Sequence, residues 1–143
     1  MQQRNIKKTD PDKRYRSVMG ATTLVGDSVH NTVDEKLGTV KEIMIDIPSG
    51  RIAYAVLSFG GALNLGNKLF AVPWSILTVD EDEKRFILNV DKEQLKNAPG
   101  FDKDNWPDMA DLSWQADVFN YYGAEPYWEE QPGEKTFRGG GGL

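Results

Sequence analysis

The chain has 143 residues, enough for one domain with a buried core, yet its hydrophobic content of 39% and mean hydropathy of −0.53 indicate that part of it lies outside that core. The absence of cysteine excludes disulfide bonds, thiolate nucleophiles and thiolate metal ligands. No run approaches the roughly 20 apolar residues that a membrane-spanning helix needs, and the basic amino end lacks the apolar stretch of a secretory signal. We therefore expect a cytoplasmic protein without a membrane span.

The net charge of −5 is distributed unevenly along the chain. Residues 1–21 carry six basic and two acidic side chains (+4), residues 22–98 carry eight and eleven (−3), and residues 99–143 carry three and nine (−6). We expect residues 1–21 to form a flexible basic arm, with contact to an anionic surface or to the acidic carboxyl-terminal segment of the same or another copy as alternatives. Because an acidic domain repels phosphates, the central domain itself is not expected to bind nucleic acid.

The first strands are predicted between residues 22 and 47. Thr22–Val25 and Ser28–His30 suit one short strand, or two pieces of it broken at a glycine. β-Branched residues favour a second strand over 39–47. Its apolar side chains cannot share one face at a strict period of two, so we expect a bulge near residues 41–42, of the kind that bends sheets into barrels.

The next strand, predicted over 51–59 after the turn 48–50, is the centre of the domain. Ile52, Tyr54 and Val56 alternate with a second apolar set on the opposite face. A strand that is apolar on both faces must be covered on both faces, so this one is predicted to be central rather than at an edge.

Three further elements complete the predicted domain. An apolar run over 68–72 predicts a strand that ends at Pro73 and Trp74, and a hairpin is expected from 77–79 and 85–90 across an acidic turn. A short helix over 91–97 is indicated by Asp91 as its cap and by Gln94 at the capping-box position. Consecutive strands with short connections predict a mainly β fold, a small and strongly bent antiparallel barrel.

Residues 99–130 form an aromatic extension after this domain, and they contain eight of the fifteen aromatic residues of the chain. Asp111 is a suitable cap for a helix from Leu112 to about Tyr122, with Gly123 as its left-handed end. The helical wheel gives two apolar stripes on roughly opposite sides, one able to seal the barrel and the other in need of a cover. The inner stripe is Met109, Leu112, Ala116 and Phe119, and the outer stripe is Trp114, Val118 and Tyr121. Residues 131–143 are expected to be a disordered tail.

Several of these segments together resemble a PRC-barrel domain, the β-barrel module shared by the cytoplasmic part of the photosynthetic reaction centre H subunit and a ribosome maturation factor. The resemblance covers about residues 22–98, and the extension resembles that of small stand-alone bacterial members. It implies a binding or assembly module rather than an enzyme; a photosynthetic or ribosomal role would follow by family analogy only. The segments are Leu37-Gly38, Ser49-Gly50-Arg51, Ala55 to Gly61, Leu69 to Trp74 and Phe86-Ile87-Leu88.

Motifs that could carry chemistry are weak. His30 is the only histidine, and no serine lies in a nucleophile-elbow pattern. The glycine-rich stretch 61–68 fails as a phosphate loop because Leu69 replaces the hydroxyl residue and a strand follows. Three aspartates between 102 and 108 lack the glycine and glutamate of an EF-hand. We predict no catalytic residue, no cofactor and no metal site, and for Trp74 a place in the core or at the barrel mouth.

Two classes of function remain at this point. The first is a non-catalytic protein-interaction module that binds itself, as a homodimer, and an unidentified protein. The second is a small-ligand binder or minor enzyme that uses the barrel mouth near Trp74. The partner-binding candidates for the first class lie in the glycine-rich loop and the extension. They are Leu63, Leu65, Trp114, Val118, Tyr121, Tyr122, Tyr127 and Trp128.

Overall fold

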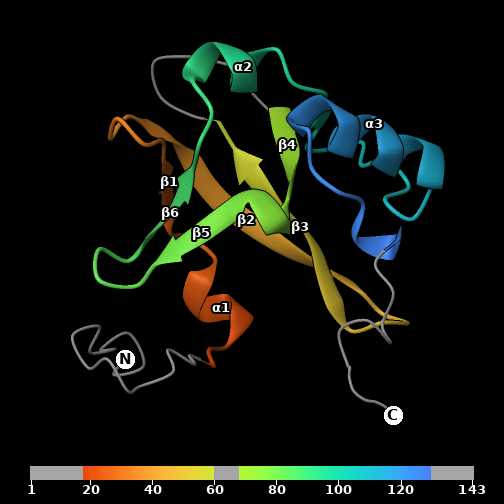
Figure 1. The fold of residues 1–143 in the computed structure, drawn as a ribbon, viewed down its shortest axis with the longest axis horizontal. Helices are drawn as coiled ribbons and strands as arrows, with labels where there is room; N and C mark the ends of the chain where they lie inside the picture. The colour runs from red at the N-terminus through yellow and green to blue at the C-terminus, as the bar shows by residue number, and fades with distance from the viewer. Residues whose placement is uncertain (1–17, 60–67, 130–143) are drawn as a thin grey trace.

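The computed structural model describes residues 18–59 and 68–129, and these contain one seven-stranded sheet (Figure 1). The strand order is β5-β6-β1-β2-β3-β4-β7. All neighbours are antiparallel except β1 and β6, which run parallel. The sheet bends strongly without closing, so the predicted mainly β, barrel-like fold is confirmed, with one parallel pair that was not expected. None of the described helices is long and apolar enough to cross a membrane.

The strands are β1 (Ser28–His30), β2 (Lys36–Asp46), β3 (Arg51–Ser58), β4 (Lys68–Pro73), β5 (Leu77–Asp80), β6 (Arg85–Leu88) and β7 (Gly100–Asp102). The helices are α1 (Ala21–Leu24), α2 (Lys92–Lys96) and α3 (Leu112–Tyr122), with short 3₁₀ turns η3 (Trp74–Ile76) and η4 (Tyr127–Glu129). In Figure 1, α2 lies at one end of the sheet and α3 lies beside β4, while the β2–β3 hairpin extends away from the body.

β3 is the central strand, as the two-sided apolar pattern predicted. It pairs with β2 on one side and with β4 on the other, and its residues 53–57 are all buried. Ala55 and Leu57 belong to the core inside the bend of the sheet, whereas Tyr54 and Val56 belong to a second core on its outer face. The domain therefore has two hydrophobic cores, and β3 contributes to both.

Two glycines permit close approaches within this sheet. A Cβ at Gly38 of β2 would lie 2.2 Å from the carbonyl oxygen of Ser58, so no other residue fits there without moving β3. A Cβ at Gly100 of β7 would lie 2.9 Å from the ring of Phe70 and 3.0 Å from the carbonyl oxygen of Leu69. The first contact gives a physical reason for the Leu37-Gly38 pair, and the second lets β7 pair with β4.

Local predictions had mixed outcomes. The bulge near residues 41–42 is confirmed by a register shift between Val40 and Glu42, and a second shift follows between Met44 and Ile45. The short helix α2 is confirmed, because Asp91 accepts a hydrogen bond from the Gln94 backbone N–H at 2.7 Å.

The first predicted strand was partly wrong. Residues 22–24 belong to helix α1, although Ser28–His30 is a strand as predicted. The α1 turn closes on the hydrogen bond from Val25 N to Ala21 O at 3.1 Å, and it buries Leu24 in the inner core. Tertiary packing thus outweighs the β preference of the two threonines.

We predict that Leu57→Ala lowers the free energy of unfolding by about 2–5 kcal/mol, because it removes fully buried methyl groups from the inner core. Chemical denaturation measures the change. Val33→Ala is the matched control, because Val33 is 73% exposed and its truncation should cost less than about 0.5 kcal/mol. A Leu57→Ala cost below about 1 kcal/mol would contradict the central position of β3.

Candidate functional site

Helix α3 has the bounds and the caps that the sequence predicts. The Asp111 carboxylate accepts hydrogen bonds from the backbone N–H groups of Ser113 at 2.8 Å and Trp114 at 3.1 Å. Gly123 ends the helix with a φ of 67°, a left-handed conformation that glycine adopts without strain. These caps fix where α3 starts and stops over the outer face of the sheet.

The face that α3 buries differs from the predicted stripes. Val118 and Phe119 are 0% and 1% exposed, and Gln115 is also buried. With the half-buried Tyr122 these residues follow the spacing i, i+3, i+4, i+7 of a single helix face. Leu112, assigned to the inner stripe, is 60% exposed. The two-stripe interpretation is wrong because the polar Gln115 stands at the centre of the buried face.

Gln115 is buried because its side chain holds the segment before the helix. Its Nε2 donates a hydrogen bond to the carbonyl oxygen of Met109 at 2.6 Å. This bond satisfies the donor end of the buried amide, while its Oε1 has no hydrogen-bond partner among the described residues. The spacing of Gln115, Val118, Phe119 and Tyr122 was present in the sequence and could have identified this face.

The outer core is a cluster of aromatic rings. Tyr54 of β3 makes edge-to-face contacts with Trp114 at a centroid distance of 5.5 Å and with Phe119 at 5.6 Å. Trp128 of η4 contacts Phe119 at 5.1 Å and Tyr127 at 5.2 Å. The extension therefore folds back over its own α3 and covers the sheet face on which Tyr54 lies.

The structure brings most of the predicted partner-binding residues into this cover. Val118 is fully buried, so the expectation that it lies on an outward stripe is corrected. The other candidates in the extension are half-buried and pack against the two cores; they are Trp114, Tyr121, Tyr122, Tyr127 and Trp128. The Tyr121 hydroxyl also donates a hydrogen bond to the carbonyl oxygen of Gln94, at 2.5 Å, and joins α3 to α2. Leu63 and Leu65 lie outside the described residues.

Two exposed apolar side chains of the extension were not among those candidates. Trp106 is 40% exposed and stacks edge-to-face on Phe101, with 5.1 Å between ring centroids. Leu112 is 60% exposed at the start of α3. We call Trp106, Leu112 and the exposed part of Trp114 the extension surface. Helical periodicity alone could not have revealed Leu112, because it lies three residues before Gln115 and seven before Phe119, which is the spacing of the buried face.

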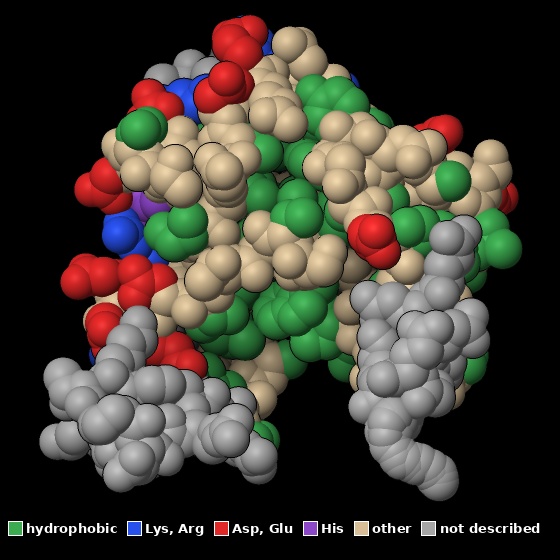
Figure 2. Space-filling view, viewed as in Figure 1, with side chains coloured by type: hydrophobic (Ala, Val, Ile, Leu, Met, Phe, Trp, Pro, Cys, Tyr) green, Lys and Arg blue, Asp and Glu red, His purple; other side chains and the backbone are tan. Residues whose placement is uncertain are grey.

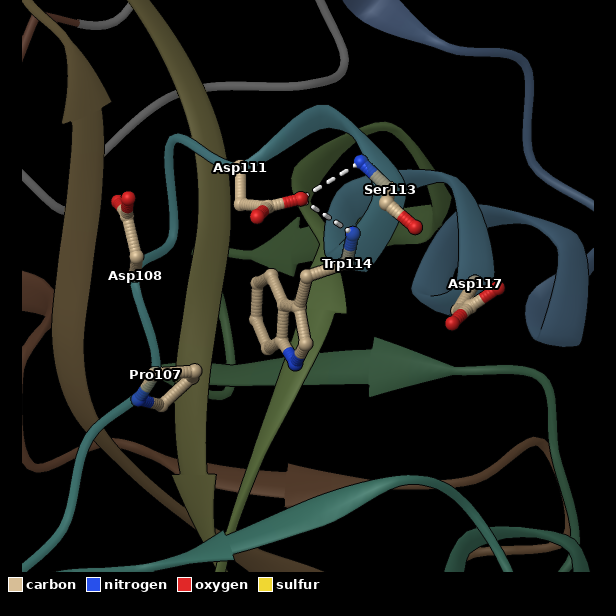
Figure 3. Close-up of a pocket in the computed structure, with 6 residues that line it drawn as sticks. All are labelled: Pro107, Asp108, Asp111, Ser113, Trp114 and Asp117. Carbon is tan, nitrogen blue, oxygen red and sulfur yellow. Dashed lines mark hydrogen bonds between the residues drawn. The ribbon is translucent and has the colours of Figure 1, made fainter.

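A shallow acidic cavity of about 340 Å³ adjoins the extension surface at Trp114 (Figure 3). The ring of Trp114 forms one wall, and the carboxylates of Asp108, Asp111 and Asp117 stand around it. Asp111 is engaged in capping α3, and Asp108 accepts a hydrogen bond from the backbone N–H of Ala110 at 3.0 Å. Two of the three carboxylates thus have local structural roles.

A second cavity, of about 430 Å³, lies where the β2–β3 hairpin, η3 and the extension meet. It is lined by Gly50, Arg51, Ile52, Ala53, Trp74, Ser75, Phe119 and Tyr127. Trp74 has the predicted position at the barrel mouth: it is half-buried and contacts Phe86 of the inner core, with ring centroids 5.8 Å apart. Trp74 therefore lies between the inner core and this cavity, which it also lines.

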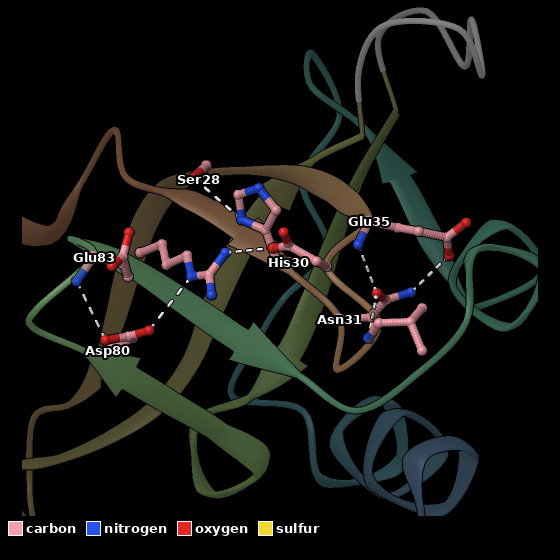
Figure 4. A network of polar contacts seen from close by, with 9 residues as sticks. Ser28, His30, Asn31, Glu35, Asp80 and Glu83 are labelled. Carbon is pink, nitrogen blue, oxygen red and sulfur yellow. Dashed lines mark hydrogen bonds and ion pairs between the residues drawn. The ribbon is translucent and has the colours of Figure 1, made fainter.

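His30 belongs to a surface polar network (Figure 4). The Ser28 hydroxyl lies 3.5 Å from Nδ1 of His30, at the limit of a hydrogen bond. Nearby, the Arg85 guanidinium pairs with Asp34 at 2.5 Å and with Asp80 at 3.4 Å. Asp34 and Asp80 therefore engage Arg85, and their contacts hold loops between strands.

Other polar groups have structural roles as well. Asn31 is 4% exposed, and its side-chain oxygen accepts hydrogen bonds from the backbone N–H groups of Val33 and Glu35, which shapes the β1–β2 turn. Asp102 accepts a hydrogen bond from the backbone N–H of Asp104 at 3.2 Å. Within residues 18–59 and 68–129, no three His, Asp or Glu side chains are grouped so that they could hold a metal ion.

Comparison with known families agrees with this architecture of a small, bent β-sheet. The family model described as "PRC-barrel domain" matches residues 17–95, more than half of the chain. The chain therefore belongs to the PRC-barrel family. No curated protein sequence matches it. The matched region ends before β7, so α3 and the aromatic cover lie beyond it.

Two tyrosine hydroxyls are buried in the contact between the extension and the barrel. Among the described residues, neither Tyr54 nor Tyr122 has a hydrogen-bond partner for its hydroxyl. Burial raises the pKa of both hydroxyls well above the ordinary value of 10.0, because the charged form would lose its hydration. In the unfolded chain the same groups ionise near pH 10, so the folded state loses stability as the pH rises above that value.

We predict that Tyr54→Phe and Tyr122→Phe leave stability at neutral pH unchanged or raise it by up to about 1 kcal/mol, because each removes an unpartnered buried hydroxyl. Each change should also reduce the loss of stability between about pH 9 and pH 11. Urea denaturation across this range is the measurement.

Tyr121→Phe is the matched control, because it removes a hydroxyl that donates to Gln94 O. It should cost about 0.5–1.5 kcal/mol at neutral pH. Equal costs for all three variants would contradict the distinction between partnered and unpartnered hydroxyls.

Proposed function

We propose that this PRC-barrel protein is a non-catalytic interaction and assembly module that associates with a second copy of itself through the extension surface. The observation that carries the proposal is that the aromatic cover of the sheet leaves Trp106 and Leu112 exposed on its outside. Exposed large apolar side chains next to polar ones are typical of protein-binding sites. Tryptophan is also enriched among residues that dominate binding energy.

The shape of the surface favours contact with a copy of the chain. The cavity beside Trp114 is bordered by Pro107 and Ser113, the sequence neighbours of Trp106 and Leu112 respectively. An apolar side chain of one copy can therefore enter the cavity of the other, and a two-fold arrangement repeats the contact. The half-buried candidates Tyr121, Tyr122, Tyr127 and Trp128 act in this proposal by supporting the surface from beneath.

The charge distribution supports association as well. In a two-fold contact without other charges, the carboxylates around Trp114 of one copy would repel the same carboxylates of the other copy. Residues 1–21, with a net charge of +4, carry the opposite sign to residues 99–143, with −6. Attraction between the basic segment of one copy and the acidic extension of the other offsets this repulsion.

The proposal is non-catalytic because the contacts of His30, Asp102, Asp108 and Asp111 are those of turns, caps and surface pairs. It retains the cytoplasmic location expected from a chain without cysteine. A part in photosynthetic or ribosomal assembly rests on family analogy alone and is not included.

Light scattering on the full chain should give twice the chain mass of 16.1 kDa at micromolar concentration. We predict that Leu112→Glu returns the mass to that of one chain. A new carboxylate would be buried at the contact, whereas the first turn of α3 itself accommodates an acidic residue.

Val33→Glu is the control, since it adds the same charge at a side chain that is 73% exposed in the β1–β2 turn. It should leave the dimer intact. A full chain that is monomeric at high micromolar concentration would refute self-association, and a dimer that survives Leu112→Glu would place the interface elsewhere.

A further inference from the structure

We propose that the 430 Å³ cavity beside Trp74 is an intramolecular docking site, which takes the ring of Phe137 from the carboxyl-terminal segment of the same chain. That segment, residues 130–143, lies outside the described residues, and its sequence supplies the occupant. The inference goes beyond self-association, because it concerns a different surface and needs no second copy. It also bears on the small-ligand alternative, since any molecule that enters the cavity would have to displace Phe137.

The cavity has a lining that suits an aromatic ring. Ala53 and Phe119 are 5% and 1% exposed and line its floor, whereas Ile52, Trp74 and Tyr127 are half-buried and line its walls. A ring that enters such a site leaves water and can meet the other rings edge-to-face. Figure 2 shows hydrophobic side chains uncovered in the middle of the molecule, where Figure 1 places β3 and the start of β5.

The described part of the chain stops beside this cavity. The Arg51 guanidinium donates a hydrogen bond from Nη1 to the carbonyl oxygen of Tyr127 at 2.7 Å, and both residues line the cavity. This bond holds η4 against the β2–β3 hairpin. Glu129, the last residue of η4, follows Tyr127 by two positions. The segment that continues from Glu129 therefore starts next to the cavity.

The spacing between Tyr127 and Phe137 allows a return to the cavity. Phe137 follows Tyr127 by ten positions, and a flexible chain of that length spans roughly 16–19 Å between its ends. Midway between them stands Pro132-Gly133, a pair that is typical of turns. A side chain tethered this closely has an effective concentration in the millimolar range. Even a weak apolar contact is therefore populated.

Phe137 is the side chain of the segment that fits the cavity best. Among residues 130–143, only Phe137 and Leu143 have large apolar side chains, and the four glycines 139–142 separate them. A phenylalanine ring buries more apolar area than a leucine side chain and loses little conformational entropy on docking. The cavity beside Tyr127 and the one aromatic residue of the segment thus form a matched pair.

Charge supports the same pairing. Lys135 and Arg138 lie within two positions of Phe137, and no carboxylate does. Burial, and after it the charge of the Asp46 carboxylate, raise the pKa of the Tyr127 hydroxyl, so Asp46 stands close to this wall of the cavity. A cationic side chain next to the docked ring would meet the Asp46 carboxylate at the margin of the site.

Nuclear magnetic resonance of the isotope-labelled full chain tests the proposal. In the unaltered chain we expect through-space magnetisation transfer between the ring protons of Phe137 and protons of Ile52 and Trp74. In a mixture of labelled and unlabelled chains, filtered spectra should show that this transfer occurs within one molecule.

Phe137→Ala should shift the indole N–H signal of Trp74 and the methyl signals of Ile52. Leu143→Ala is the matched control, because it truncates the other large apolar side chain of the segment and should leave both signals in place.

A second pair of variants fills cavities. Ser75→Tyr places a ring in the cavity from an exposed position on its wall, and the Phe137 contacts should be lost. Ser113→Tyr is the control, because Ser113 is equally exposed but lines the cavity beside Trp114, and the contacts should remain.

The proposal is overturned if Phe137 shows no transfer to Ile52 or Trp74 in the unaltered chain, or if the transfer occurs only between different chains. It is also overturned if Phe137→Ala leaves the Trp74 and Ile52 signals unchanged. The measurement on the unaltered chain decides the matter even where a variant fails to fold. Because Phe137→Ala leaves Trp106 and Leu112 in place, the mass from light scattering should not change, and either proposal can fail without the other.

Discussion

The contact between the aromatic extension and the outer face of β3 and β4 is the interaction on which the structure depends. Alternate residues of these strands point to opposite faces, and both faces are apolar. The bend of the sheet encloses one face. The other would leave Tyr54, Val56, Leu69 and Ala71 in water if α3 did not lie over it.

This contact also explains why apolar side chains remain exposed on the extension. The family region supplies the bent sheet, and the segment after it supplies the outer cover. The cover buries Val118 and Phe119 against the sheet and leaves Trp106 and Leu112 partly exposed. That exposure is the observation behind the proposed self-association.

The sequence was informative wherever a local rule determines the structure. The two-sided β3, the Asp111 and Gly123 caps of α3 and the bulge after Val40 all follow from residue patterns of a few positions. These features are short-range, so one sequence carries enough information to predict them.

Predictions failed where contacts with residues distant in the sequence determine the local structure. The helical turn α1 forms because Leu24 packs into the inner core, against the strand preference of its threonines. The buried face of α3 centres on Gln115, whose Nε2 donates a hydrogen bond to Met109 O, a partner outside the helix. The cavity at Trp74 arises from a strand pairing that stops at Pro73 and from the return of η4. No local pattern encodes the packing of Leu24 or the end of the β3–β4 pairing, whereas the spacing of the buried α3 residues was present in the sequence.

Native-state amide hydrogen exchange tests the central claim, that the extension is an integral cover of the sheet. If α3 and β3 form one cooperative unit, the backbone amides of Val118 and Phe119 should open with the same free energy as those of Val56 and Leu57, equal to that of global unfolding. Exchange of the α3 amides through an opening at least about 2 kcal/mol less costly than that of β3 would contradict the account. It would show that the helix detaches while the barrel stays folded.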